Sequence, residues 1–332
     1  MQYGTQILKG RLARGILLVA ALLTLVTLAW PGGVQGAPSA PLTPEQMRLI
    51  AEKERARKEA GMVDLSTLEG VYAQPGEPAR QFVGTIYIEK GELLADLEAA
   101  WAADQKTLDL LERNGGSKAV QRMREEFEKQ RRDIEALPDG LIRLDIPSVE
   151  VGRHSIRFST FTYSGLQPKD PINIVFYRVG TAWDVNYDMQ NWTRLRWQST
   201  GCGASQRVYI WDAQHTGGWD GWRDMQYQLE REQGWFCGSP RYHIRLFGSF
   251  VRDSHSPGFG WWTVADAHHD NLFHTCTDGW ENAESTVLNS FQNADGSPLW
   301  FVGVRWQADL GNAGYYQCAY NDGRAWFIEL LY

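Results

Sequence analysis

The chain contains no lysine after Lys169. Residues 170–332 carry 11 arginines against 18 aspartates and glutamates, whereas basic and acidic residues balance in residues 1–169. A net negative region without lysine is a poor partner for nucleic acid, because that affinity comes mainly from neutralising phosphates. It is equally unfavourable at anionic lipid surfaces. We therefore expect no nucleic-acid partner.

The chain also has only one long uncharged apolar stretch, at residues 15–30. Basic residues precede it, and a Pro-Gly-Gly sequence with small or medium residues at positions 34 and 36 follows it. This is the layout of a secretory signal peptide, and the stretch is shorter than the ~20 residues that span a bilayer. We predict a signal peptide at residues 1–36, cleaved before Ala37, with an uncleaved anchor as the alternative. Both place the remainder outside the cytoplasm, secreted or in the cell envelope, with no membrane span after signal cleavage.

Cysteine is absent from the first 201 residues. An even number of cysteines confined to one region of an exported protein predicts two disulfide bonds. Three pairings are possible, and the local one, Cys202 with Cys237 and Cys276 with Cys318, is our working hypothesis. No C-x2-C pair occurs, which disfavours a zinc ribbon.

Residues 37–140 are predicted to be mainly helical and to form a spacer or subdomain. Thr43 is followed by proline and acid, as at the start of a helix. Two later segments are strongly helical and are separated by Asn-Gly-Gly, which favours a helical hairpin. The later helices are expected at residues 92–113 and 118–136, after a strand at residues 81–89.

Residues 141–332 are predicted to form one α+β domain with a mixed or antiparallel sheet and flanking helices, preceded by the helical segment. Short runs of β-branched and aromatic residues bounded by turn residues indicate the strands. This region holds 13 of the 15 tryptophans, most of which should pack in its core. Strands are expected at residues 141–146, 154–163, 172–179, 207–211, 242–247, 261–267, 299–307 and 325–332, and helices at residues 183–192, 222–232 and 280–291.

Histidine is concentrated in one short part of the domain. Five of the seven histidines lie between His243 and His274. Alternation along a strand places His243 and Arg245 on one face, and the same rule places Asp266 and His268 together. If the two strands pair as a hairpin, these four side chains converge.

Two chemistries suit this convergence. His243, His268 and Asp266 could hold zinc or another divalent metal and leave a position for water. Alternatively, the histidines could act as general acid or base beside Arg245, which would bind a phosphate or carboxylate. No H-E-x-x-H or other defined metal signature is present, so histidines that hydrogen-bond within a polar structural layer remain the alternative.

A second candidate region is rich in aromatic and acidic residues around a Gly-Gly pair. Flat rings and carboxylates are the side chains with which protein surfaces bind sugars. The alternative is a tight loop held in place by its aromatic residues. The proposed ligand-binding residues are Trp211, Asp212, His215, Trp219, Asp220 and Trp222.

Three segments resemble, in order, the LssY carboxy-terminal domain. They are the strand at residues 171–176, the Tyr-His-Ile-Arg-Leu-Phe strand at residues 242–247, and residues 262–274 with the acidic helix that follows. The resemblance covers residues 171–291. It implies an extracytoplasmic α+β domain of a kind often found beside membrane phosphatase modules, with no settled activity.

The resemblance also implies that His243, Arg245 and His274 match the family pattern, which favours a phosphate-related site. This chain departs from the family in lacking a membrane phosphatase module, and in carrying four cysteines and a tryptophan-rich insert around residues 197–237.

Three functions are therefore considered. The first is a secreted or cell-envelope binding protein, directed at glycans or another envelope component. The second is an extracytoplasmic metal- or phosphate-handling hydrolase that uses the histidine cluster. The third is a structural envelope protein in which the aromatic core and disulfides provide durability.

Overall fold

The computed structural model describes residues 42–60, 79–151, 156–159, 161–164, 167–177, 181–200, 206–211, 221–231, 240–248, 262–271, 277–316 and 318–331. The chain divides into two units, Met1–Arg55 and Ala56–Tyr332. Helix α2 (Pro44–Glu59) begins as predicted, because Thr43 Oγ1 accepts a hydrogen bond from Gln46 N at 3.2 Å. The predicted signal peptide lies outside the described residues and stays a prediction.

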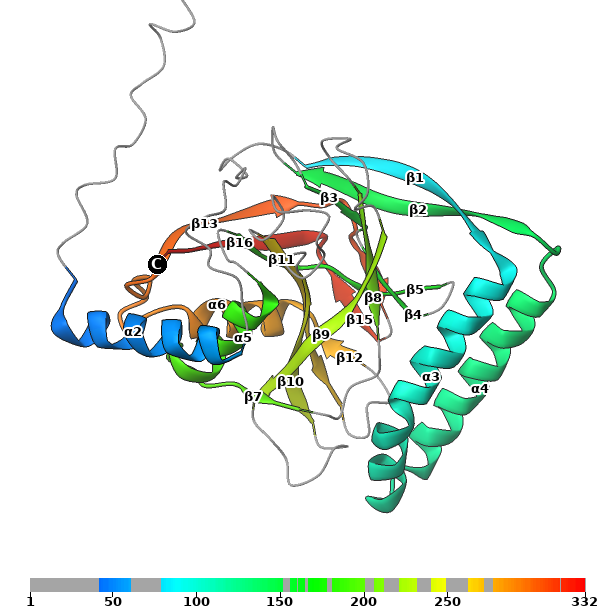
Figure 1. The fold of residues 1–332 in the computed structure, drawn as a ribbon, viewed down its shortest axis with the longest axis horizontal. Coiled ribbons are helices and arrows are strands. Elements are labelled where there is room, and N and C mark those ends of the chain that lie inside the picture. The colour runs from blue at the N-terminus through cyan, green and yellow to red at the C-terminus, as the bar shows by residue number, and fades with distance from the viewer. Residues whose placement is uncertain are drawn as a thin grey trace, which may run out of the picture. The chain divides into compact units, whose positions relative to one another are not determined.

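Two long helices are inserted between the strands of one β-ribbon. Strand β1 (Arg80–Glu89) leads directly into α3 (Lys90–Arg113) and α4 (Ser117–Glu135), and β2 (Leu141–Val151) returns antiparallel to β1 along its whole length. The helices contact each other through apolar side chains, and the rings of Trp101 and Phe127 stack at 4.5 Å. The strand and both helices match the sequence predictions. The boundary predicted at residue 140 lies between α4 and β2, within this ribbon (Figure 1).

Fourteen strands of the described residues form one mixed sheet. Its main path runs β1-β2-β3-β8-β9-β10-β11-β6-β16-β13, and adjacent strands are antiparallel except for the parallel pair β6 and β16. The predicted α+β class with a mixed sheet is therefore confirmed. The remaining strands of this sheet are β3 (Ile156–Ser159), β4 (Phe161–Ser164), β5 (Gln167–Pro171), β6 (Ile174–Tyr177), β7 (Gln198–Ser199), β8 (Arg207–Trp211), β9 (Gly221–Arg231), β10 (Arg241–Gly248), β11 (Trp262–Asp270), β12 (Thr277–Gly279), β13 (Val302–Asp309) and β16 (Arg324–Leu330).

The sheet is strongly curved (Figure 1). Residues from strands as distant along the path as β2 and β13 join one buried cluster, which includes Val149, Val208, Phe247 and Phe327. The ends of the path also approach each other, since Gln81 Nε2 of β1 donates to the carbonyl of Leu310 at 3.1 Å. Inward-facing residues of the central strands are therefore removed from solvent on this side.

The outer face of the central strands is covered by two helices. Helices α5 (Ala182–Asn191) and α6 (Glu281–Ser290) bury residues such as Val185 and Val287 against Ile244 and Leu246 of β10. Both helices were predicted from the sequence. Trp197 is fully buried at the edge of this layer, where its indole nitrogen donates to Ser290 Oγ at 2.8 Å. The expectation that tryptophans build the core holds at this position.

The helix predicted at residues 222–232 is wrong, because Gly221–Arg231 form strand β9. Methionine, glutamine, leucine and glutamate favour a helix when the local sequence is considered alone. The segment instead pairs with β8 on one side and β10 on the other. The hydrogen bonds to β8 along residues 221–224 and to β10 along residues 225–231, together with the burial of Leu229, outweigh the helical preference, which is a weak determinant.

A two-stranded hairpin lies outside the main sheet and consists of β14 (Gly314–Tyr316) and β15 (Ala319–Asn321). Cys318 lies in its turn and is not a free thiol. The other three cysteines lie outside the described residues, so the predicted pairing stays a prediction. None of the helices in the described part of the chain has the length and apolarity needed to cross a bilayer.

Candidate metal centre

The predicted convergence of histidines occurs between β10 and β11. These strands are antiparallel neighbours, and His243 lies opposite His268 while Arg245 lies opposite Asp266. Because side chains alternate along a strand, all four point to the inner face of the curved sheet. The next pair on that face, Arg241 and Asp270, was not predicted.

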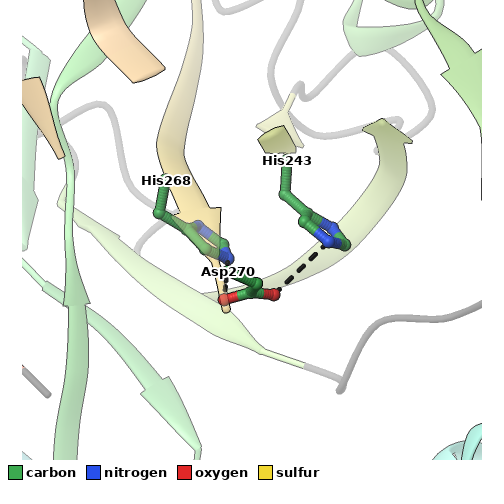
Figure 2. Close-up of side chains that lie close together, drawn as sticks. All are labelled: His243, His268 and Asp270. Carbon is green, nitrogen blue, oxygen red and sulfur yellow. Dashed lines mark ion pairs between the residues drawn. The ribbon is translucent and has the colours of Figure 1, made fainter. Parts of the chain in front are cut away.

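Two imidazole rings and one carboxylate form the innermost group of this cluster. The rings of His243 and His268 are parallel, with 2° between their planes and 5.3 Å between their centroids. Both Nε2 atoms face the carboxylate of Asp270, at 3.3 Å from Oδ2 for His243 and 3.4 Å from Oδ1 for His268 (Figure 2). All three residues are buried, with exposures of 0%, 1% and 5% for His243, His268 and Asp270.

These spacings fit the coordination of a small divalent metal. Zinc binds imidazole nitrogen and carboxylate oxygen at about 2.0–2.2 Å, so two ligand atoms at a tetrahedral angle are about 3.3–3.5 Å apart. The ligand atoms of His243, His268 and Asp270 all lie within 4.8 Å of one another. The structure thus places Asp270 in the position that the sequence analysis gave to Asp266.

Asp266 lies instead on the far side of His268. Its Oδ1 accepts a hydrogen bond from His268 Nδ1 at 2.9 Å, which fixes the ring so that Nε2 faces Asp270. A carboxylate in this position orients a histidine ligand and increases its basicity. Asp266 therefore has the position of a residue that supports a ligand.

A second group of three potential ligands, Asp170, Asp266 and His268, is occupied by an arginine. Arg245 Nη1 lies 2.9 Å from Asp170 Oδ2 and 3.2 Å from Asp266 Oδ1. The guanidinium already supplies the positive charge that a metal would bring. We therefore do not assign a metal to this group.

Both ring nitrogens of His243 make hydrogen bonds to neighbouring side chains. Its Nδ1 lies 2.5 Å from the side-chain nitrogen of Gln228, and Gln228 Oε1 has no other partner. Exchanging the two atoms of this amide lets Oε1 accept a hydrogen bond from the Nδ1–H of His243. In that tautomer Nε2 carries a lone pair, which accepts a hydrogen bond from Arg241 Nε at 2.8 Å.

Arg241 is itself fixed beside the histidines. Its Nη1 lies 2.9 Å from Glu230 Oε2, and both side chains are buried. Burial lowers the pKa of Arg241, while the charges of Glu230 and Asp270 act in the opposite direction. A buried guanidinium thus lies next to the three potential ligands.

The charged groups shift one another's pKa values. Burial lowers the pKa of His268, but the charge of Asp270 and the hydrogen bonds of Asp266 and Asp270 outweigh it and raise this pKa to about 9. Burial raises the pKa of Asp266. Burial would raise that of Asp170 as well, but the charge of Arg245 and the hydrogen bond from Gln206 contribute to a net lowering.

The residues proposed for glycan binding are mostly outside the described part of the chain. Asp212, His215, Trp219 and Asp220 belong to residues 212–220, which the structure does not describe, and the same is true of His274. The backbone of Trp211 ends β8.

Trp222 lies in β9 and is half-buried. Its ring meets Tyr209 edge to face at 5.2 Å, and the guanidinium carbon of Arg207 lies 5.5 Å from its centroid. These contacts show how Trp222 packs and leave its proposed ligand role a prediction.

Sequence reasoning missed several members of the buried cluster. Asp270 and Arg241 continue the alternation of the predicted residues by one step, so the same period-two rule could have found them. Gln228 and Glu230 were hidden by the wrong helix prediction for β9. Asp170 comes from β5, and no local pattern links it to β10.

Comparison of the chain with known protein families, curated proteins and solved structures finds no match. The resemblance to the LssY carboxy-terminal domain therefore stays a prediction. The candidate centre rests on the geometry of its own residues.

Proposed function

We propose that this protein is an extracytoplasmic metal-dependent hydrolase whose metal ligands are His243, His268 and Asp270. The observation that supports the proposal is the arrangement of three buried potential ligands, in which each imidazole Nε2 lies 3.3–3.4 Å from an oxygen of Asp270, with Asp266 on the second nitrogen of His268. The extracytoplasmic location is supported by the layout of residues 1–36.

A centre with two histidines and one carboxylate has the ligand set of hydrolytic zinc sites. Three protein ligands leave a coordination position for water, and zinc lowers the pKa of that water to about 7. The protein contributes the positions of the ligands. Asp266 holds His268, and Gln228 holds His243, so that both Nε2 atoms face the same point.

Arg241 favours a substrate with an anionic oxygen. A metal bound at His243 Nε2 would take the lone pair that now accepts the Arg241 Nε–H, and this buried donor would need a new acceptor. A phosphoryl oxygen beside the metal is a suitable one, because guanidinium groups bind phosphate strongly. Arg245 is less suited to this role, since two carboxylates already flank it. Among hydrolysable bonds we therefore favour a phosphoester.

The first test is elemental analysis of the mature protein, purified without a metal-binding tag. We expect about one zinc or other transition metal per chain, and its loss in His243→Ala and Asp270→Asn. The control is His269→Ala, because His269 follows His268 in β11 but points to the other face of the sheet. A fully folded protein that holds no metal, even after incubation with zinc, would refute the proposal.

The second test is a panel of phosphoesters, carboxylic esters and glycosides. We expect the metal-loaded protein to hydrolyse phosphoesters, the His243→Ala variant to be inactive, and His269→Ala to retain activity. If the metal-loaded protein hydrolyses no compound of the panel, the protein binds metal but the proposal that it is a hydrolase is refuted.

A further inference from the structure

The buried network around the candidate metal centre carries more negative than positive charge. Its described members include four carboxylates and two guanidinium groups, all at most 5% exposed. They are Asp170, Glu230, Asp266, Asp270, Arg241 and Arg245. With neutral histidines, four negative and two positive charges leave a net charge of −2 on these described residues.

A divalent metal would neutralise this charge. A histidine that binds metal is neutral, because its ring nitrogen must offer a lone pair. His268 then donates its remaining N–H to Asp266 Oδ1, which also pairs with Arg245 at 3.2 Å, so Asp266 counts as a carboxylate. The six charged residues and one divalent ion thus have no net charge. Such a balance matters in a protein interior, since an uncompensated buried charge is costly.

The balance limits the charge that a substrate can bring into the site. A phosphodiester is a monoanion, whereas a phosphomonoester is mainly a dianion above its second pKa of about 6. The diester would leave the described network and its metal one charge from neutrality, and the monoester would leave them two. Protonation of Asp266 would shift both sums by the same amount, and the diester would still be closer to balance.

The positions that can receive phosphoryl oxygens also fit a diester. One lies beside the water on the metal, because zinc can add a fifth ligand during catalysis. The other is the Nε–H of Arg241, which bonds to His243 Nε2 at 2.8 Å and would lose this acceptor to a metal. These two positions match the two non-bridging oxygens of a diester. A monoester has a third terminal oxygen, and both arginines of the described network already pair with carboxylates.

Glu230 is the carboxylate of this network whose charge can be changed with the least effect on the metal ligands. Its Oε2 lies 2.9 Å from Arg241 Nη1. The other three carboxylates either face the histidines or pair with Arg245. Glu230 therefore contributes negative charge beside the position of the substrate and positions Arg241, while the coordination of the metal depends on other residues.

We propose that the site hydrolyses phosphodiesters in preference to phosphomonoesters, and that the charge of Glu230 contributes to this preference. The inference rests on the proposed hydrolase activity. In the reaction, the oxygen of water bonds to phosphorus, and the bond to one ester oxygen breaks with its electron pair on that oxygen. One hydrogen of the water stays on the phosphoryl group, and the other passes to the departing alcohol. The product is a monoester, whose second ionisation favours its release by the same balance of charge.

The test compares three chromogenic substrates with the zinc-loaded full mature chain at pH 8. They are bis(4-nitrophenyl) phosphate, 4-nitrophenyl methylphosphonate and 4-nitrophenyl phosphate. The first two are monoanions, but the phosphonate has a single ester group, as the monoester has. We expect kcat/KM for both monoanions to exceed that for the dianionic monoester by roughly tenfold or more, because an additional uncompensated charge in the interior is costly.

The matched variants change one carboxylate each. In Glu230→Gln the ratio of kcat/KM for diester to that for monoester should fall by roughly fivefold or more, because a dianion gains twice as much as a monoanion when one negative charge is removed. Glu230→Asp keeps the charge and should keep the ratio. The control is Asp145→Asn, since Asp145 is exposed on β2, where it pairs with Arg143.

The outcomes separate this inference from the proposed function. Hydrolysis of none of the three substrates refutes the hydrolase and this inference together. Faster hydrolysis of the monoester than of the diester overturns the inference and leaves the hydrolase standing. A phosphonate that is hydrolysed as slowly as the monoester would show that charge is not the cause, which overturns it without any variant. A wild-type ratio in Glu230→Gln would overturn the role of Glu230.

Discussion

Arg245 and Asp266 face each other across β10 and β11, and His243 and His268 face each other two residues further along the same inner face. Asp170, Asp266 and His268 form one group of three potential metal ligands, with Arg245 beside it, and His243, His268 and Asp270 form the other. All of these residues are buried. In the first group an arginine lies between two carboxylates. In the second, two imidazoles share one carboxylate, Asp270.

A buried arginine lies beside each group, but Arg245 pairs with two of the potential ligands themselves, whereas Arg241 pairs with Glu230, which is outside its group. Arg245 compensates Asp170 and Asp266 permanently, because a guanidinium is not deprotonated in proteins. Imidazoles can instead give up a proton and offer a lone pair to a metal. We therefore interpret the Arg245 group as structural and the His243 group as the site that binds a ligand, although they share one sheet face.

Removing the arginine should have the largest effect. Arg245→Met leaves Asp170 and Asp266 buried without their cation, and we expect the free energy of unfolding to fall by about 3–5 kcal/mol. Denaturant titration of the metal-free protein measures this loss.

The control is Arg143→Met on β2, where an exposed arginine pairs with Asp145 at 3.0 Å. That variant should lose far less stability, because exposed ion pairs contribute little. Equal losses in the two arginine variants would contradict the structural role of Arg245.

Replacing the proposed metal ligand Asp270 should have a smaller effect on stability, and this effect should depend on the presence of metal. A metal present at 100 times its dissociation constant stabilises the folded protein by about 2.7 kcal/mol. We expect zinc to raise the unfolding midpoint of the wild type and not that of Asp270→Asn. In the presence of chelator, the two proteins should differ much less. A shift with zinc that persists in Asp270→Asn would place the metal elsewhere.

The sequence predicted the pairs on β10 and β11 because one rule governs them. Alternation along each strand and antiparallel pairing together place His243 beside His268, and both conditions hold in the structure. The helices that cover the outer face of the sheet follow from their own periodicity. Where local pattern and tertiary packing agree, sequence reasoning is sufficient.

The rest of the site depends on contacts that no local pattern encodes. Gln228 reaches His243 from β9, a strand whose composition favours a helix, and Asp170 reaches Arg245 from β5. The choice between Asp266 and Asp270 as the metal ligand also needed coordinates, since both share the inner face of β11. Their difference lies in which nitrogen of His268 each one meets.

Asp266 links the two groups, because it pairs with Arg245 and accepts a hydrogen bond from His268, so changing it tests whether they are separable. Asp266→Asn preserves the shape of the side chain and an oxygen that can accept from His268 Nδ1, but removes the charge that makes the ring more basic. We expect zinc affinity, measured by competition with a chromogenic chelator, to fall by about 10- to 100-fold. Asp170→Asn should leave zinc affinity nearly unchanged, since Asp170 contacts Arg245 and Gln206. Equal losses in both variants would mean that the two groups act as one.

Glu284 of α6 extends the comparison to a buried carboxylate that pairs with no cation of the described residues. Burial raises its pKa to about 9, and the charges of Glu281 and Asp322 act in the same direction. Its exposure is 2%, and Oε1 has no hydrogen-bond partner. Arg245 shifts the pKa of Asp170 in the opposite direction.

Because the folded-state pKa of Glu284 is above its usual value of 4.5, the neutral acid is favoured by folding. The stability that this provides is complete below about pH 4.5 and is lost as the pH rises towards 9. Glu284→Gln removes the ionisable group, so at pH 8 the free energy of unfolding of the variant should exceed that of the wild type, by as much as about 5 kcal/mol for the full shift. The gain should vanish at pH 4. Denaturant titration at the two pH values measures it, and a gain of equal size at both would show that ionisation of Glu284 is not its cause.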